Sequence, residues 1–207
     1  MPVKIAAGHH TIADWDFWHG AAGRSLSSDH FISAPTSLKL VYSAGAETNV
    51  VLCRIPATLV LPQGEVRHYF RPSSYAQVSF TFRNQAALGS ADWLNCYFVF
   101  ITATSWQVRR ITNGYPFTVG TSGTTSHIDV WNHFRLFWYN GKTPAEQPAL
   151  CIDLYKDIAG EWVKQGSTIY DTTNKWADSA INRCGFWLTM GGGDIAYIDD
   201  TEIWGPV

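Results

Sequence analysis

The chain has 207 residues, 46% of them hydrophobic and 15% charged, which supplies a sizeable core and excludes an intrinsically disordered protein. Its formal net charge of −2 gives no electrostatic basis for binding nucleic acid or an anionic membrane, so neither is expected as a partner. No apolar run approaches the roughly 20 residues that a membrane-spanning helix requires.

Residues 1–15 are expected to form an N-terminal arm. Polar His9 and His10 interrupt any apolar stretch, so this segment does not read as a secretory leader, and synthesis in the cytoplasm is expected. A final place on a virion surface is compatible with that expectation. No linker or repeat divides the chain, and we expect one domain over 1–207.

Short apolar or alternating runs follow one another along the chain, each bounded by Gly, Pro, Asn, Ser or Asp. They predict strands at 36–43, 48–54, 65–71, 76–83, 94–103, 106–112, 132–139, 149–156, 161–165, 184–190 and 195–204. The phrase GTSGTTS, residues 120–126, predicts a flexible loop, and 173–181 predicts at most one short helical turn. Many short strands with frequent turns indicate an all-β sandwich or barrel.

Alternation within three of these runs separates apolar from polar faces, because successive side chains of a strand point to opposite sides. The faces expected to pack between the sheets carry Val66, His68 and Phe70; Val78, Phe80 and Phe82; and Phe134, Leu136 and Trp138. The opposite faces carry Arg67, Tyr69 and Arg71; Gln77, Ser79, Thr81 and Arg83; and His133, Arg135, Phe137 and Tyr139. Core packing is also the interpretation favoured for Trp187 and Trp204.

The four cysteines sit singly inside strand-like runs, at Cys53, Cys96, Cys151 and Cys184. Because no CxxC pair occurs, a zinc ribbon is not expected. Buried free thiols are favoured, although the sequence leaves one or two disulfides open.

Three phrases in order resemble concanavalin A-like and laminin-G-like domains: FISAPTSLKLVYS, VWNHFRLFWYNG and GGGDIAYIDDTEIWG. Together they span most of residues 30 to 205. The resemblance implies a jelly roll, a sandwich of two curved antiparallel sheets with one concave face. This superfamily contains lectins, carbohydrate-binding modules, glycoside hydrolases, polysaccharide lyases and virion proteins, so the fold does not select the function.

The closing strand carries adjacent acids, Asp199 and Asp200. In carbohydrate-binding jelly rolls an Asp of this strand often binds a structural calcium, so the resemblance implies calcium at Asp199 or Asp200. The alternatives are a solvated strand end or a hydrogen bond to a neighbouring loop. Adjacent strand residues face opposite ways, so the two carboxylates are not expected to line one pocket as a catalytic pair.

Enzyme signatures are weak. The E-x-D-x-x-E phrase of jelly-roll hydrolases is missing, and the nearest approach is Asp200 with Glu202 on one face. A polysaccharide lyase needs a cation for a uronate and a Tyr or His for proton transfer, which Arg67, Tyr69 and His133 could supply if they line one groove. The known alginate-lyase phrases are absent.

We therefore expect a non-catalytic, lectin-like module that binds a glycan or a protein surface. The candidate glycan-binding residues are Arg67, Tyr69, Arg71, Arg83, His133, Arg135, Tyr139, Trp106 and Trp176, with Trp176 the best exposed platform. The alternatives are a virion structural protein, assembled as a homo-oligomer or on a particle, and a lyase for uronate-containing glycans.

Overall fold

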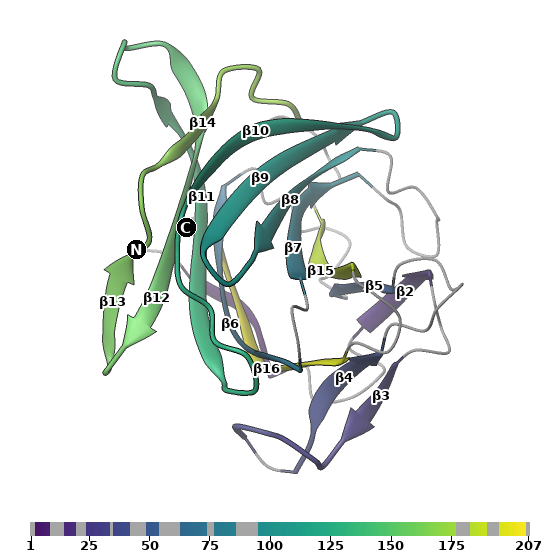
Figure 1. Cartoon of the computed structure of the whole chain (residues 1–207). Coiled ribbons are helices and arrows are strands. Elements are labelled where there is room, and N and C mark those ends of the chain that lie inside the picture. The colour runs from purple at the N-terminus through teal and green to yellow at the C-terminus, as the bar shows by residue number, and fades with distance from the viewer. Residues whose placement is uncertain are drawn as a thin grey trace.

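The computed structural model describes residues 3–8, 15–19, 24–33, 35–41, 49–53, 63–73, 77–85, 95–176, 183–189 and 195–205. Within these ranges all regular structure is β, arranged in two antiparallel sheets that pack face to face (Figure 1). This confirms the predicted all-β jelly-roll sandwich. No helix in the described part of the chain is long and apolar enough to cross a membrane.

The nine-stranded sheet follows the order β13-β12-β11-β6-β16-β4-β3, with β1 paired to β16 and β14 paired to β12. Its strands are β1 (Val3–Gly8), β3 (Arg24–Ser27), β4 (Ser37–Val41), β6 (Gly64–Pro72), β11 (Asn132–Lys142), β12 (Pro148–Ile158), β13 (Glu161–Lys164), β14 (Ile169–Asp171) and β16 (Ile195–Gly205). The seven-stranded sheet follows the order β10-β9-β8-β7-β15-β5-β2. Its strands are β2 (Trp15–His19), β5 (Asn49–Cys53), β7 (Gln77–Asn84), β8 (Cys96–Ile101), β9 (Ser105–Thr112), β10 (Tyr115–Gly123) and β15 (Arg183–Thr189).

Every predicted run overlaps a strand, but five strands were not predicted: β1, β2, β3, β10 and β14. Strand β1 lies inside the segment expected to be an N-terminal arm and pairs with β16. Strand β10 includes the first four residues of GTSGTTS, which is therefore only partly a loop. In the described part of the chain this edge strand pairs only with β9, and most of its residues are exposed, so it lacks the buried apolar face of the predicted strands. In the described part of 173–181 the predicted helical turn is absent.

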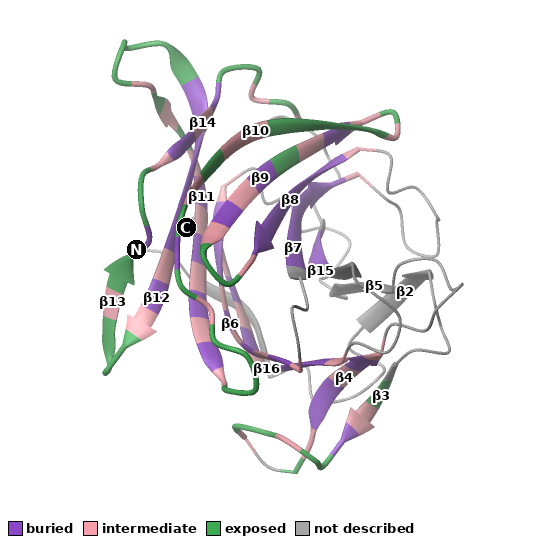
Figure 2. Ribbon diagram, viewed as in Figure 1, coloured by how far each residue is buried: buried purple, intermediate pink, exposed green. Residues whose placement is uncertain are grey.

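The core lies between the sheets, where the buried residues of β6, β11 and β12 face those of β7, β8 and β9 (Figure 2). Phe134, Leu136 and Trp138 are all buried, as their alternation predicts. The Trp138 ring packs on that of Phe82 from the other sheet, with centroids 5.0 Å apart. The nine-stranded sheet therefore turns its other face away from the sandwich; we call this its outer face.

The described cysteine side chains are free thiols. Cys96, Cys151 and Cys184 are buried and unbridged, which confirms the favoured interpretation for these three. The side chain of Cys53 lies outside the described residues.

A buried histidine makes the stability of this core sensitive to acid. The ring centroids of His68 and Phe80 lie 6.0 Å apart, and burial lowers the pKa of His68 to about 3. The unfolded chain therefore binds a proton between pH 6.5 and 3 that the folded chain does not, so stability is lost as the pH falls through this window.

Between pH 7 and pH 5 this group should lower the free energy of unfolding by about 2 kcal/mol. We expect His68→Phe to remove that part of the loss, because phenylalanine does not titrate. Urea unfolding of both proteins at the two pH values checks this. An equal loss in both would show that His68 does not set the acid sensitivity.

Candidate functional site

The outer face of the nine-stranded sheet brings together two polar strand faces that the sequence analysis singled out. Tyr69 on β6 pairs with His133 on β11, and two residues away Arg67 pairs with Arg135. On the other side of β6, Arg67 pairs with Glu202 of β16. Because directly opposed residues on antiparallel strands share a face, these five side chains form neighbouring rows.

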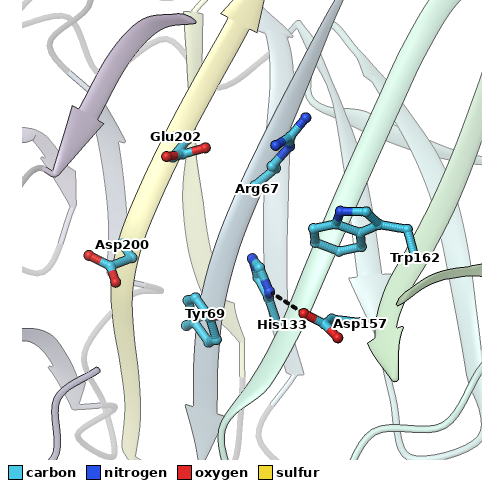
Figure 3. Close-up of a pocket in the computed structure, with 7 residues that line it drawn as sticks. All are labelled: Arg67, Tyr69, His133, Asp157, Trp162, Asp200 and Glu202. Atoms are coloured by element: carbon cyan, nitrogen blue, oxygen red, sulfur yellow. Dashed lines mark hydrogen bonds and ion pairs between the residues drawn. The ribbon is translucent and has the colours of Figure 1, made fainter. Parts of the chain in front are cut away.

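A pocket of about 440 Å3 opens on this face (Figure 3). Glu202 and Asp200 border it from β16, and Trp162 borders it from β13 on the opposite side. The complete lining is Arg67, Tyr69, His133, Asp157, Trp162, Asp200 and Glu202. Carboxylates, a cation and aromatic rings thus converge in one open hollow.

Three rings form the aromatic part of the pocket. The rings of Tyr69 and His133 stack with their centroids 3.8 Å apart, and the Trp162 ring lies 4.5 Å from His133. His133 Nδ1 lies 3.1 Å from a carboxylate oxygen of Asp157. Since a carboxylate only accepts hydrogen bonds, this contact places the imidazole proton on Nδ1 and makes Nε2 an acceptor.

The ionisation of these groups follows from burial. Desolvation lowers the pKa of His133, although Asp157 opposes the effect, so the imidazole is neutral at pH 7. Desolvation, together with the negative charges of Asp157, Asp200 and Glu202, raises the pKa of the Tyr69 phenol. Tyr69 therefore offers a protonated hydroxyl rather than a phenolate.

The buried carboxylate of Glu65 positions Arg67, the cation that lines the pocket, and its neighbour Arg135. The two oxygens of Glu65 accept hydrogen bonds from Arg67 Nε and from an Arg135 terminal nitrogen, the latter at 2.6 Å. The Arg67 guanidinium also lies 4.6 Å from the ring centroid of Trp204 and 6.0 Å from that of Trp162. Glu65 thereby fixes the positions of both guanidiniums through charge-assisted hydrogen bonds.

The side chains of Asp199 and Asp200 have different surroundings because strand β16 bulges between them. The pairing of β16 with β6 shifts between Asp199 and Glu202, and Asp200 has a positive φ of 43°. Asp200 lines the pocket with Glu202. Asp199 is buried and turns to a loop: its Oδ2 accepts from the backbone N–H groups of Ile32 at 2.7 Å and Ser33 at 3.1 Å.

The surroundings of Asp199 do not fit a calcium ligand. Its Oδ1 accepts a third backbone N–H, from Asp200 at 2.8 Å, so both carboxylate oxygens already accept hydrogen bonds from the backbone. Among the described residues, no group of three or more His, Cys, Asp or Glu side chains could hold a metal ion. Of the roles weighed for this acid, the geometry matches the hydrogen bond to a neighbouring loop.

Three candidates are placed away from the pocket. Trp106 is fully buried and donates its indole N–H to the Gln165 carbonyl at 2.9 Å, so it cannot offer a platform to a ligand. Trp176 is half-buried rather than exposed as expected, because it packs against the core with its ring nearly perpendicular to that of Tyr97. Arg83 is buried and hydrogen-bonded to the loop that carries Trp176.

The remaining candidates lie on the outer face beyond the pocket. Arg71 makes a loose contact of 3.8 Å with Asp129, and the Tyr139 hydroxyl donates to Asp153 at 3.3 Å. Trp204, assigned to the core from sequence, is half-buried on this face and donates its indole N–H to Glu202 at 3.1 Å. The outward direction of Trp204 follows from alternation with buried Ile203.

Asp157 and Trp162 were not among the sequence candidates. Both come from the β12–β13 hairpin, where Asp157 pairs with Trp162 and both side chains take the outer face. A signal existed, because 161–165 was predicted as a strand and the short DIAGEW turn implies that it pairs with 149–156. The register that brings Trp162 beside His133 depends on the turn geometry.

Comparison with known proteins places the fold among sandwich proteins. No protein-family model matches the chain, and no curated protein matches its sequence. A marine PL-14 alginate lyase from Aplysia kurodai aligns over 99% of this chain and 100% of its own, with 10% identity and a TM-score of 0.65.

Two further structures cover nearly the whole chain. The exoplasmic/lumenal domain of VIP36, in a Ca2+/Man-bound form, aligns over 94% of this chain and 84% of its own, with 12% identity and a TM-score of 0.56. A carbohydrate esterase from the Shiga toxin-encoding bacteriophage phi24B aligns over 100% of both chains, with 15% identity and a TM-score of 0.54. The chain shares the jelly-roll sandwich fold of these proteins.

Proposed function

We propose that the outer-face pocket binds a carbohydrate and that this protein is a non-catalytic, lectin-like module. The observation that carries the proposal is the set of aromatic rings, from Tyr69, His133 and Trp162, beside hydrogen-bonding groups in one open pocket. The apolar face of a sugar ring packs on aromatic side chains, while polar groups bind its hydroxyls. A volume of about 440 Å3 falls in the range of small-ligand pockets.

The shared fold supports a carbohydrate as the ligand class. The structures that align over most of this chain include a Ca2+/Man-bound domain and a phage enzyme named for carbohydrate chemistry. Since folds host many functions, the pocket residues carry the proposal and the fold adds weight to it.

A uronate lyase is the enzyme alternative, favoured by the contact between His133 and Asp157. The remaining groups favour binding instead. Glu65 already pairs with Arg67 and Arg135, so the charge available to neutralise a uronate is reduced. The raised pKa of Tyr69 makes its phenol a poor proton acceptor. Incubation with alginate separates the two, because a lyase releases unsaturated sugars that absorb ultraviolet light.

Assembly into an oligomer or on a virus particle is a second alternative. It rests on the edge strand β10, where Tyr115 and Phe117 are 71% and 49% exposed. Light scattering during size-exclusion chromatography tests this alternative independently of ligand binding.

The pocket proposal predicts that Trp162→Ala weakens glycan binding about tenfold or more. Trp162 is half-buried on a short edge strand, so its loss should remove the stacking surface while leaving the fold intact. A glycan array with the wild-type protein identifies the ligand, and calorimetry then compares both proteins on it. Tyr115→Ala removes an exposed aromatic ring from the other sheet and should bind like the wild type. Equal affinity of the Trp162 variant would contradict the proposal.

A further inference from the structure

A second group of side chains continues the outer face beyond the pocket. We call Arg135, Tyr139, Tyr155, Lys164 and Tyr170 the distal cluster. The three tyrosines are half-buried, and the side chains of Arg135 and Lys164 are 27% and 39% exposed. The distal cluster thus combines aromatic rings with two cationic side chains.

Strand register makes the two regions continuous. Arg135 pairs with pocket residue Arg67 on one side and with Tyr155 on the other, and Tyr155 pairs with Lys164. Four residues further along β11, Tyr139 pairs with Cys151 of β12, and Cys151 pairs on its other side with Tyr170 of β14. Tyr139 and Tyr170 therefore lie in one row across the sheet. From His133 to Tyr139 is six residues, or about 20 Å at the rise of an antiparallel strand.

The distal cluster is held in place by a buried acid. Asp153 accepts a hydrogen bond from Thr168 at 2.7 Å, pairs with Lys164 at 2.7 Å and accepts from the Tyr139 hydroxyl at 3.3 Å. The Tyr139 ring also packs on Phe137, with centroids 4.9 Å apart. Side chains fixed in this way lose little entropy when a ligand binds.

Arg135 joins the distal cluster to the pocket. Its guanidinium lies 5.5 Å from the ring centroid of Tyr155. It also donates a hydrogen bond to Glu65, the carboxylate that binds Arg67 of the pocket. A ligand that leaves the pocket along β11 therefore meets a cation and then an aromatic ring.

We propose that the pocket and the distal cluster form one elongated surface that binds an oligosaccharide chain across several sugar units. This inference rests on the proposed function and specifies its ligand as an oligomer rather than a single terminal sugar. Both guanidiniums that face the chain share the buried Glu65 carboxylate, and Lys164 is paired with Asp153. Such paired cations suit the hydroxyls of a neutral glycan.

The test uses malto-, cello-, xylo- and manno-oligosaccharides of one to six units in calorimetric titrations with the full chain. Affinity for the preferred series should rise at least tenfold from the single sugar to the longest chain. Tyr155→Ala and, separately, Tyr170→Ala should abolish most of that rise and leave the affinity for the single sugar unchanged. Phe117→Ala, which removes an exposed ring from the other sheet, should keep the full rise.

The outcomes separate the two proposals. A single sugar that binds in a Trp162-dependent way, with no gain from added units, would overturn the oligosaccharide surface and leave the proposed function standing. A gain that both tyrosine variants retain would overturn the distal cluster as its source. No binding by any of these sugars or by the glycan array would overturn both proposals. Melting temperatures of the variants confirm that each is folded.

Discussion

Replacing Asp199 with alanine is expected to lower the free energy of unfolding by about 2 to 3 kcal/mol. The buried carboxylate accepts three backbone N–H groups, from Ile32, Ser33 and Asp200, and alanine would leave all three without this acceptor. Asn at the same position keeps one acceptor oxygen and should lose less. Denaturant unfolding of the three proteins measures the difference.

Two comparisons isolate this role. Asp129→Ala removes an exposed acid in loose contact with Arg71 and should change stability by less than about 0.5 kcal/mol. A chelator should leave the wild-type melting temperature unchanged, because three backbone N–H donors already bind the carboxylate of Asp199. A melting temperature that falls on chelation would instead support the calcium site implied by the family resemblance.

Glu65→Ala is the second change with a large expected effect, on stability and on binding together. The variant leaves Arg67 and Arg135 facing each other without the carboxylate they share, so we expect a loss of about 3 kcal/mol. Both guanidiniums would also move, and glycan affinity should fall even where the protein remains folded. Calorimetry with the array ligand, at a temperature where the variant is folded, measures the second effect.

The control for Glu65 is an exposed pair of the same chemistry. Glu146→Ala removes the partner of Lys142, and both side chains are largely exposed, so at most about 0.5 kcal/mol should be lost. Glu65→Gln keeps the shape and removes the charge, and should fall between alanine and wild type. If Glu65→Ala were as stable as Glu146→Ala, the buried carboxylate would not organise the site.

The period-two alternation of the sequence predicted much of this site. It placed Arg67 and Tyr69 on one face of β6 and His133 and Arg135 on one face of β11, as the structure has them. Alternation could equally have placed Trp106 in the core, since it shares a face with buried Val108. The direction of the side chain along the strand is therefore the feature that identifies Trp106 as a core residue.

What the sequence did not predict depends on contacts between distant segments. Trp176 packs against the core because its loop is hydrogen-bonded to buried Arg83, which lies 93 positions earlier in the chain, on strand β7. The bulge at Asp200 depends on a positive φ that Asp adopts without any distinctive neighbouring residue. Trp162 joins the pocket only through the register of the β12–β13 hairpin.

The most direct test of the central claim is a map of the binding face by nuclear magnetic resonance. The indole N–H signals of Trp162 and Trp204 should shift on titration with the array ligand, because both rings flank Arg67. Those of buried Trp106 and Trp138 should stay in place. Shifts confined to residues of the seven-stranded sheet, with Trp162 unmoved, would contradict a binding site on the outer face.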